Sequence, residues 1–151
     1  MMRITHDEVQ QILAIVRRES ASLGKAICVA VVDSGGYIVA IERPEGGRPL
    51  TPTIALSKAY SAAVMQRPTN AYLGWAENQP VFFSQVARMG WQPIVATLGG
   101  MTLKRGEHFL GGVGIGGGTG EEDHVIAEKI IAELGFDTDF DAWGQPAAKK
   151  G

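Results

Sequence analysis

Two short apolar segments, each followed by a glycine-containing turn and a returning strand, most constrain how this chain can fold. Residues 26–32 are apolar and rich in β-branched side chains, residues 33–36 read Asp-Ser-Gly-Gly, and residues 37–41 are apolar again. Two strands around a short glycine-rich turn predict a β-hairpin. Residues 101–103 and 108–110 repeat this pattern around a second turn. The chain is therefore expected to contain an antiparallel sheet.

Amphipathic segments surround the two hairpins. A capping box formed by Thr5 and Glu8 opens the first segment, and a second capping box formed by Thr119 and Glu122 opens the last. Thr51 is expected to cap the middle helix, with proline at its first position. The predicted helices span residues 6–23, 54–66, 69–75 and 119–134, residues 76–93 are ambiguous, and residues 94–97 are a candidate short strand.

The order helix, hairpin, helices, hairpin, helix predicts an α+β fold, in which helices pack on an antiparallel sheet. It lacks the strand–helix alternation of a Rossmann fold. The length of 151 residues fits one domain. We expect that domain over residues 1–135, followed by a C-terminal tail, residues 136–151, that loses hydrophobic periodicity and is partly disordered.

Composition argues against several classes of protein. The 14 basic and 16 acidic residues give a net charge of −2, which disfavours nucleic-acid binding. No segment approaches the roughly 20 apolar residues that span a bilayer, and the N-terminus lacks the apolar core of a signal peptide. The sequence predicts a cytoplasmic protein. Its single cysteine, Cys28, excludes an intrachain disulfide and is expected to be buried and inert.

Glycine is the compositional outlier, with 20 residues in 151. Many of them lie in the run 111–118, directly before the last predicted helix. Exposed backbone N–H groups at a helix start can bind an anion, which makes Gly116, Gly117 and Gly118 candidate ligand contacts. The alternative is that these glycines only let a strand twist and a helix pack closely against it.

Charged side chains in unusual sequence surroundings are the next candidates for binding or catalytic residues. Lys58 lies in a helix that is otherwise small and apolar, and Arg67 lies at its end, so either cation could anchor an anion. Glu122 and Asp123 begin the last helix and could act as an acid or a base. Each also has a structural interpretation, because cations reach solvent and acidic groups stabilise a helix N-terminus.

The histidines match no metal-binding spacing. His108 and His124 are nevertheless candidates for ligation of iron, and the alternative for each is a solvated side chain.

Five short motifs are spread over residues 5–135. They are Ala-Val-Val-Asp-x-Gly-Gly at 30–36, Ala-x-x-Lys-Ala-x-x-Ala at 55–62, Arg-Pro-Thr at 67–69, Gly-Gly at 99–100, and Gly-x-x-Gly-x-Gly-Gly at 111–117 with Glu-Asp following at 122–123. Their joint spacing resembles the GlcG/HbpS-like family of haem-binding or haem-degrading-type domains. That family also includes the C-terminal domain of PduO-type corrinoid adenosyltransferases.

The resemblance implies a profilin-like fold, with a five-stranded antiparallel sheet flanked by helices, and a homo-oligomer. It also implies a cleft that in some members holds haem or another tetrapyrrole, and an association with catabolic operons. The chain departs from the family at Gly116, where members usually carry serine, and in the unusually aromatic segment 76–93. That segment contains Trp91, a further candidate ligand contact.

Three hypotheses follow from these observations. The first is a small-ligand-binding domain for haem, another tetrapyrrole or an anionic metabolite, in a cleft that joins Lys58 and Arg67 to the backbone of Gly116–Gly118. The second is a catabolic-pathway enzyme that acts on a small carboxylated or aromatic substrate, with Lys58, Glu122 or Asp123 as acid or base. The third is an accessory structural subunit.

Overall fold

The structure is a computed structural model that describes residues 2–138 and residue 140. Along the chain the elements are α1 (His6–Leu23), β1 (Cys28–Asp33), β2 (Ile38–Glu42), α2 (Thr51–Val64), the 3-10 helix η1 (Thr69–Tyr72), α3 (Leu73–Asn78), α4 (Pro80–Val86), β3 (Gly100–Arg105), β4 (His108–Gly116) and α5 (Gly120–Leu134).

The strands form one antiparallel sheet in the order β2-β1-β4-β3, which confirms both predicted hairpins. The central strands β1 and β4 pair from Cys28 opposite Gly116 to Asp33 opposite Gly111. The second hairpin is longer than expected, because β4 continues through most of the glycine run rather than ending before it. An antiparallel sheet with packed helices confirms the α+β class.

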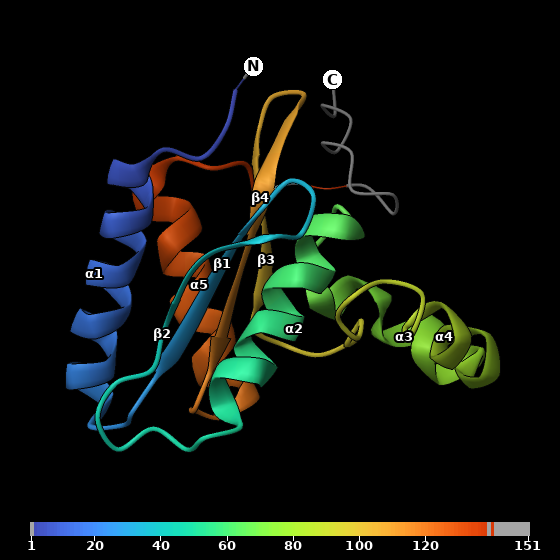
Figure 1. The fold of residues 1–151 in the computed structure, drawn as a ribbon, viewed down its shortest axis with the longest axis horizontal. Coiled ribbons are helices and arrows are strands. Elements are labelled where there is room, and N and C mark those ends of the chain that lie inside the picture. Colours follow the sequence, from blue (N-terminus) through green and yellow to red (C-terminus); the bar gives the residue numbers. More distant parts are fainter. Residues whose placement is uncertain (1, 139, 141–151) are drawn as a thin grey trace, which may run out of the picture.

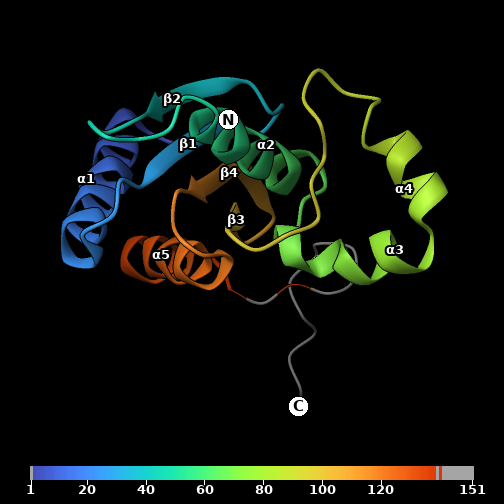
Figure 2. The same ribbon diagram turned by 90° about the horizontal axis from the view of Figure 1, so that it is seen from below.

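Helices cover both faces of the sheet, as Figures 1 and 2 show. Helices α1 and α5 share a large apolar core with one face, which includes Val29, Val31 and Val113. Helix α2 covers the other face through small side chains, among them Ala55 and Ala59. The sheet is therefore the middle of three layers. Cys28 is buried beneath α2, as expected, and burial raises the pKa of its thiol.

Close packing of α2 on β4 accounts for part of the glycine run. A Cβ atom on Gly112 would lie 2.2 Å from the Ala59 carbonyl oxygen, and one on Gly114 would lie 2.0 Å from the Ala55 carbonyl oxygen. Either contact is far inside van der Waals distance, so a side chain would push the helix off the sheet. The packing interpretation is confirmed for these two glycines.

The helix ends follow most of the sequence signals. Both predicted capping boxes are present, and the helices α1 and α5 end at glycines in the left-handed region. The prediction for Thr51 was wrong: it is the first residue of α2, and Leu50 occupies the cap position without a side-chain hydrogen bond. Thr69, which the sequence also offers as a cap for the helix predicted over 69–75, does not cap it, because its hydroxyl accepts a hydrogen bond from the backbone of Gly100 at 3.0 Å.

The expected fifth strand is not formed in the described part of the chain, which contains four strands. In residues 94–97, the candidate short strand, the first two amides donate to the end of α4 and to α2 instead. The Ile94 amide donates to the Ala87 carbonyl at 3.0 Å, and the Val95 amide donates to the Ser61 hydroxyl at 2.9 Å. Because these two amides already have partners, they cannot pair with a neighbouring strand. The segment therefore passes over α2 as coil and does not join the sheet.

The first residues after α5 belong to the folded domain. Phe136 is part of the main core, and the Asp137 amide donates to the Lys104 carbonyl at 2.8 Å. The disorder predicted for the end of the tail concerns residues outside the described range. None of the helices in the described chain has the length and apolar character needed to cross a bilayer.

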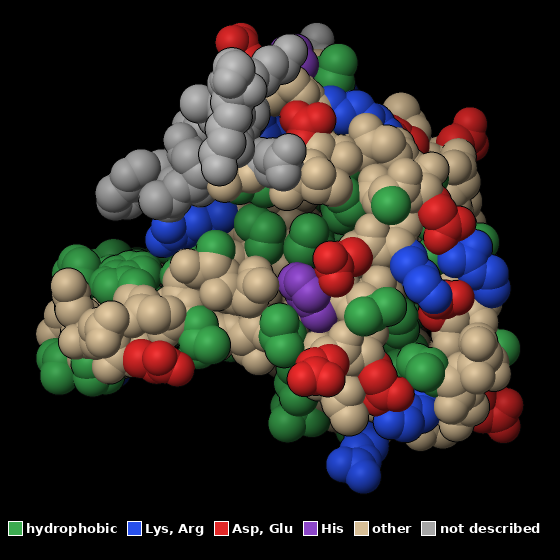
Figure 3. Space-filling model, turned by 180° about the vertical axis from the view of Figure 1, so that it is seen from behind, with side chains coloured by type: hydrophobic (Ala, Val, Ile, Leu, Met, Phe, Trp, Pro, Cys, Tyr) green, Lys and Arg blue, Asp and Glu red, His purple; other side chains and the backbone are tan. Residues whose placement is uncertain are grey.

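The segment 73–89 forms an arm that projects from the three layers (Figures 1 and 2). Helices α3 and α4 contain no buried residue, and hydrophobic side chains gather on the arm in Figure 3. The most exposed are Val81 at 72% and Met89 at 75%. Aromatic contacts of Trp75 with Phe82 and Phe83 hold the two helices together.

Candidate functional site

The glycine turn, residues 116–118, links the end of β4 to the start of α5, and Gly117 is the position in it with least room for a side chain. Gly117 has φ +110°, and a Cβ there would lie 2.4 Å from the Ala26 carbonyl oxygen. A Cβ on Gly118 would lie 2.9 Å from the Asp123 carboxylate, and one on Gly116 would lie 3.1 Å from the Thr51 methyl carbon. The positive φ and the backbone contact explain why position 117 needs glycine whether or not a ligand binds, whereas the contacts at positions 116 and 118 are tight but involve side-chain atoms.

A buried ion pair lies directly behind the glycine turn. The Lys58 Nζ is 3.1 Å from the Asp123 Oδ2 and donates to the Ile115 carbonyl oxygen at 2.8 Å. The other carboxylate oxygen, Oδ1, accepts a hydrogen bond from the Gly118 amide at 2.9 Å. The side chains are 6% and 4% exposed, so the pair ties α2, β4 and α5 together inside the molecule.

Burial is the largest influence on the Asp123 carboxyl. It raises the pKa of Asp123 above its ordinary value, while the Lys58 ammonium and the Gly118 amide oppose that rise. Both carboxylate oxygens are already occupied by these two partners. In this arrangement the pair holds the glycine turn in place rather than presenting a free charge to solvent.

Glu122 faces the other side of the turn. Its Oε1 accepts hydrogen bonds from the Thr119 amide at 2.9 Å and from the Lys25 Nζ at 2.6 Å. The Lys25 ammonium holds the pKa of Glu122 below its ordinary value. The carboxylate therefore caps α5 and neutralises a neighbouring cation.

A hollow of about 430 Å³ opens beside the glycine turn, and we call it the basic hollow. Two of its lining side chains are cationic and none is acidic. Its walls come from the segment between α1 and β1, the loop before α2, the first residue of α2 and the turn itself. The lining consists of Lys25, Ala26, Gly46, Gly47, Arg48, Thr51, Gly117 and Gly118.

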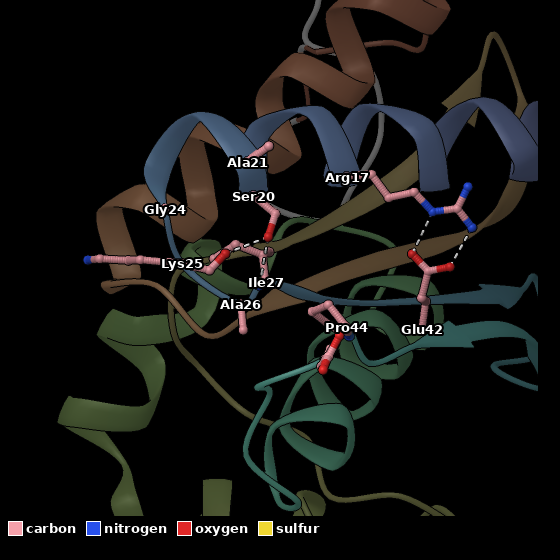
Figure 4. Close-up of a pocket in the computed structure, with 10 residues that line it drawn as sticks. Arg17, Ser20, Ala21, Gly24, Lys25, Ala26, Ile27, Glu42 and Pro44 are labelled. Carbon is pink, nitrogen blue, oxygen red and sulfur yellow. Dashed lines mark hydrogen bonds and ion pairs between the residues drawn. The ribbon is translucent and has the colours of Figure 1, made fainter.

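A second hollow of about 500 Å³ adjoins the first and shares Lys25 and Ala26 with it (Figure 4). Its two cations are paired with carboxylates, because the Arg17 Nε donates to the Glu42 carboxylate at 2.9 Å and Lys25 to Glu122, and its lining also contains the acidic Glu45. Figure 4 shows this ion pair on one wall and the Lys25 side chain extending away from the hollow. The basic hollow is therefore the better candidate for an anion.

The structure divides the residues predicted from the sequence into two groups. Lys58, Glu122 and Asp123 all lie next to the glycine turn: Asp123 bonds the Gly118 amide and Lys58, and Glu122 bonds the amide of Thr119, which follows the turn. Arg67 and Trp91 do not lie there.

Arg67 and Trp91 lie toward the opposite end of the sheet. Helix α2 begins beside Gly116, and its last residue approaches Gly36, so Arg67 follows the far end of α2. The Arg67 guanidinium lies 5.4 Å from the ring centre of Tyr72. Trp91 stacks on Tyr37 at 6.4 Å, beyond the β1–β2 turn. Neither of the two hollows is lined by Lys58 or Arg67, so neither is the expected cleft that joins these two cations to the glycine backbone.

The two candidate iron ligands lie apart from each other. His108 is exposed at the start of β4, and the glycine turn lies at its other end. His124 is on α5, with its Nε2 3.7 Å from the Glu128 carboxylate and its buried Nδ1 without a hydrogen-bond partner in the described chain. Among the described residues no group of three potential metal ligands is assembled.

Sequence reasoning missed Lys25 and Arg48. Each looks like an ordinary surface cation, because Lys25 follows the glycine that ends α1 and Arg48 lies in a loop rich in glycine and proline. Only the fold brings positions 25, 48 and 117 to one place.

The comparisons with known proteins agree with this fold. The family model described as "Haem degrading protein HbpS-like" matches residues 4–132. The chain is 26% identical over 137 residues to the corrinoid adenosyltransferase PduO of Citrobacter freundii, which covers 91% of this chain. It spans only 41% of the length of that relative.

Solved structures show the same architecture. The Klebsiella pneumoniae protein ORFY superposes with a TM-score of 0.79 at 26% identity, covering 87% of this chain and 91% of its own. The structure of a PduOC–haem complex superposes with a TM-score of 0.81 at 24% identity, covering 91% of this chain and 99% of its own. The motif spacing, the fold and the family match together show that this chain belongs to the HbpS-like family.

Proposed function

We propose that this chain is a small-ligand-binding domain whose ligand carries a carboxylate: haem or another tetrapyrrole, or an anionic metabolite. The observation that carries the proposal is the basic hollow, where Lys25 and Arg48 meet the glycine turn without an acidic side chain in the lining. A carboxylate placed there gains charge-assisted hydrogen bonds, which are about twice as strong as neutral ones.

Relatives support a tetrapyrrole as one candidate ligand. The family description names haem degradation, and the PduOC structure is that of a haem complex. Haem carries two propionate groups, so a site for carboxylates suits a tetrapyrrole as well as a smaller acid.

The iron of haem does not fit the basic hollow. Iron in haem proteins is ligated by histidine, cysteine, methionine or tyrosine, and the lining contains none of these. A tetrapyrrole at this site is therefore held through its carboxylates, with the macrocycle outside the hollow. His108 and His124 remain the candidates for contact with iron elsewhere on the surface.

A second candidate function is acid–base catalysis on a small carboxylated or aromatic substrate. It is favoured by one observation, the raised pKa of Asp123 beside a hollow, because perturbed carboxyl groups often mark catalytic sites. In that case Lys58, Glu122 and Asp123 supply or accept the proton. Binding is the stronger proposal, since the Asp123 oxygens and the Lys58 ammonium already satisfy each other.

Absorption spectroscopy tests the proposal directly. Purified protein is titrated with haemin, and isothermal calorimetry follows propionate, benzoate and metal-free protoporphyrin IX. We expect saturable binding of at least one carboxylate-bearing compound at a defined stoichiometry. If none of the four binds, the domain is an accessory structural subunit and the proposal is wrong. If benzoate or propionate is consumed rather than bound, the enzyme is the better description.

A further inference from the structure

We infer that the basic hollow is a subsite for a single carboxylate group on an aliphatic chain, with Arg48 as its principal contact. The inference rests on the proposed function and specifies which groups recognise the ligand and which chemistry they select. It does not depend on iron.

The charge balance of the hollow selects one negative charge. Lys25 is neutralised by Glu122, whose carboxylate oxygen is 2.6 Å from the Lys25 Nζ. Arg48 is exposed, and its guanidinium has no ion-pair or hydrogen-bond partner among the residues that the structure describes; only its backbone carbonyl accepts, from the Thr51 amide at 3.1 Å. One uncompensated guanidinium remains, and it matches one carboxylate.

The geometry favours a carboxylate that approaches the backbone closely. The guanidinium of Arg48 is a planar fork that can hold both oxygens of a carboxylate. Gly46 and Gly47 on one wall and Gly117 and Gly118 on the other carry no side chains, so a ligand can approach their backbone. The amides of Gly47 and Gly118 already donate to Pro44 and Asp123, which leaves those of Gly46 and Gly117 for a ligand. The Thr51 hydroxyl, at the rim of α2, makes no hydrogen bond within the described chain and supplies a further polar group.

The lining also excludes ring systems from the interior. It contains no aromatic side chain, and Ala26 is its only apolar one. An aromatic acid or a porphyrin ring has nothing to stack on there. The shared chemistry is an aliphatic carboxylate, which can come from a small free acid or from the propionate arm of a tetrapyrrole.

NMR spectroscopy of the ¹⁵N-labelled full chain distinguishes these sources. The probes are propionate, benzoate, inorganic phosphate and metal-free protoporphyrin IX, each followed through the backbone amides. We expect propionate to shift the amide signals of Gly46, Gly47, Gly117 and Gly118 saturably and competitively with chloride. Protoporphyrin shifts of the same four signals identify a tetrapyrrole propionate as a second source.

The matched variants are Arg48→Gln and Arg43→Gln. Both remove one exposed cation from the same loop, and only Arg48 lines the hollow. We expect the affinity for propionate to fall about tenfold or more in Arg48→Gln and less than about twofold in Arg43→Gln.

Three outcomes overturn the inference. They are an Arg48→Gln variant that binds propionate as the parent does, phosphate or benzoate that binds at the four glycines more tightly than propionate, and an absence of any shift at those glycines. If haemin still binds in any of these cases, only the inference fails and the proposed function stands. If no carboxylate compound binds the parent protein anywhere, the proposed function fails with it.

Discussion

Lys58 and Asp123 illustrate, at the scale of single residues, how a buried charge is tolerated. Each is about 95% buried or more, and each has the other as its counter-ion. Breaking a buried pair by removing one partner typically costs about 3–5 kcal/mol, because the other charge is left uncompensated. The structure therefore changes the expectation for Lys58, from a ligand anchor to a residue that holds the glycine turn.

The variant Lys58→Met should lower the free energy of unfolding by about 3–5 kcal/mol. The double variant Lys58→Met with Asp123→Asn should recover much of the loss, since a neutral amide oxygen can still accept from the Gly118 amide. Urea unfolding measures both. Lys129→Met is the control: its exposed pair with Glu19 should be worth less than about 1 kcal/mol. Equal losses for Lys58→Met and Lys129→Met would contradict the assignment.

The same variant should show a distinctive dependence on pH. Burial raises the pKa of Asp123 in the folded protein, so protonation of this carboxyl favours the folded state. Stability from this group is present below its unfolded pKa, near 3.9, and is lost as the pH rises through the folded pKa. Without Lys58 the folded pKa rises further. The stability deficit of Lys58→Met should therefore shrink between about pH 7 and pH 4, and a constant deficit would count against a buried carboxylate.

Some residues of the candidate site can be predicted from the sequence and others cannot, for physical reasons. Lys58 is conspicuous because it interrupts a small, apolar helix. Its partner Asp123 is 65 positions away and looks like any acidic residue in the first turn of a helix. Arg48 carries no local signal at all, because its role depends on the distance between a loop and the glycine turn.

At the scale of elements, glycine residues most clearly determine how closely α2 packs on β4. Ideal Cβ atoms on Gly112 and Gly114 would fall within 2.2 Å of backbone atoms in α2, so the helix backbone lies almost directly on the strand. The Ala residues of α2 complement these glycines. The sequence leaves close packing of a helix on the glycine run as one of two alternatives, and it does not identify α2 as that helix.

Gly114→Ala should destabilise the protein by about 3 kcal/mol, the upper part of the range for overpacking. The added methyl group meets the Ala55 carbonyl oxygen at 2.0 Å, and backbone cannot rotate away as a side chain can. The control is Gly74→Ala in α3, where no atom lies within 4 Å of the added Cβ. That change should be neutral or stabilising by up to about 1 kcal/mol. Thermal unfolding of the two variants compares them, and a Gly114→Ala protein as stable as the parent would contradict this packing.

Local signals predicted most elements but not all of their limits. The capping boxes at Thr5 and Thr119 place two helix starts correctly, because a cap is a contact between residues three positions apart. Residues 94–97 were predicted as a strand from their composition, yet their amides bond to Ala87 and Ser61. Hydrogen bonds to distant elements leave no trace in a window of a few residues.

At the scale of the whole molecule, the arm of α3 and α4 stands out from an otherwise layered domain (Figure 2). Helices of 6 and 7 residues are too short to be stable alone, and no side chain in either is buried. Exposed apolar surface of this kind typically marks an interface. A homo-oligomer therefore remains a prediction, and the arm is the surface through which we expect its subunits to contact each other.

Light scattering in solution tests whether the protein is a homo-oligomer that assembles through the arm. The parent protein should have a mass that is a multiple of that of one chain, and Val81→Asp, a change at a side chain 72% exposed, should lower it to the mass of one chain. Val125→Asp on α5, where the side chain is 48% exposed, serves as the control and should leave the assembly intact. A monomeric parent protein, or an oligomer indifferent to Val81→Asp, would exclude the arm as the interface.

The central claim is that a carboxylate-bearing ligand binds at the glycine turn, and its most direct test is paramagnetic mapping with haemin. Ferric iron broadens the NMR signals of nearby amides, so ¹⁵N–¹H spectra recorded with and without haemin locate the macrocycle. We expect the amides of Gly46, Gly47, Gly117 and Gly118 to broaden first and most. Broadening confined to the arm and Trp91, with those four glycine signals unchanged, would contradict it.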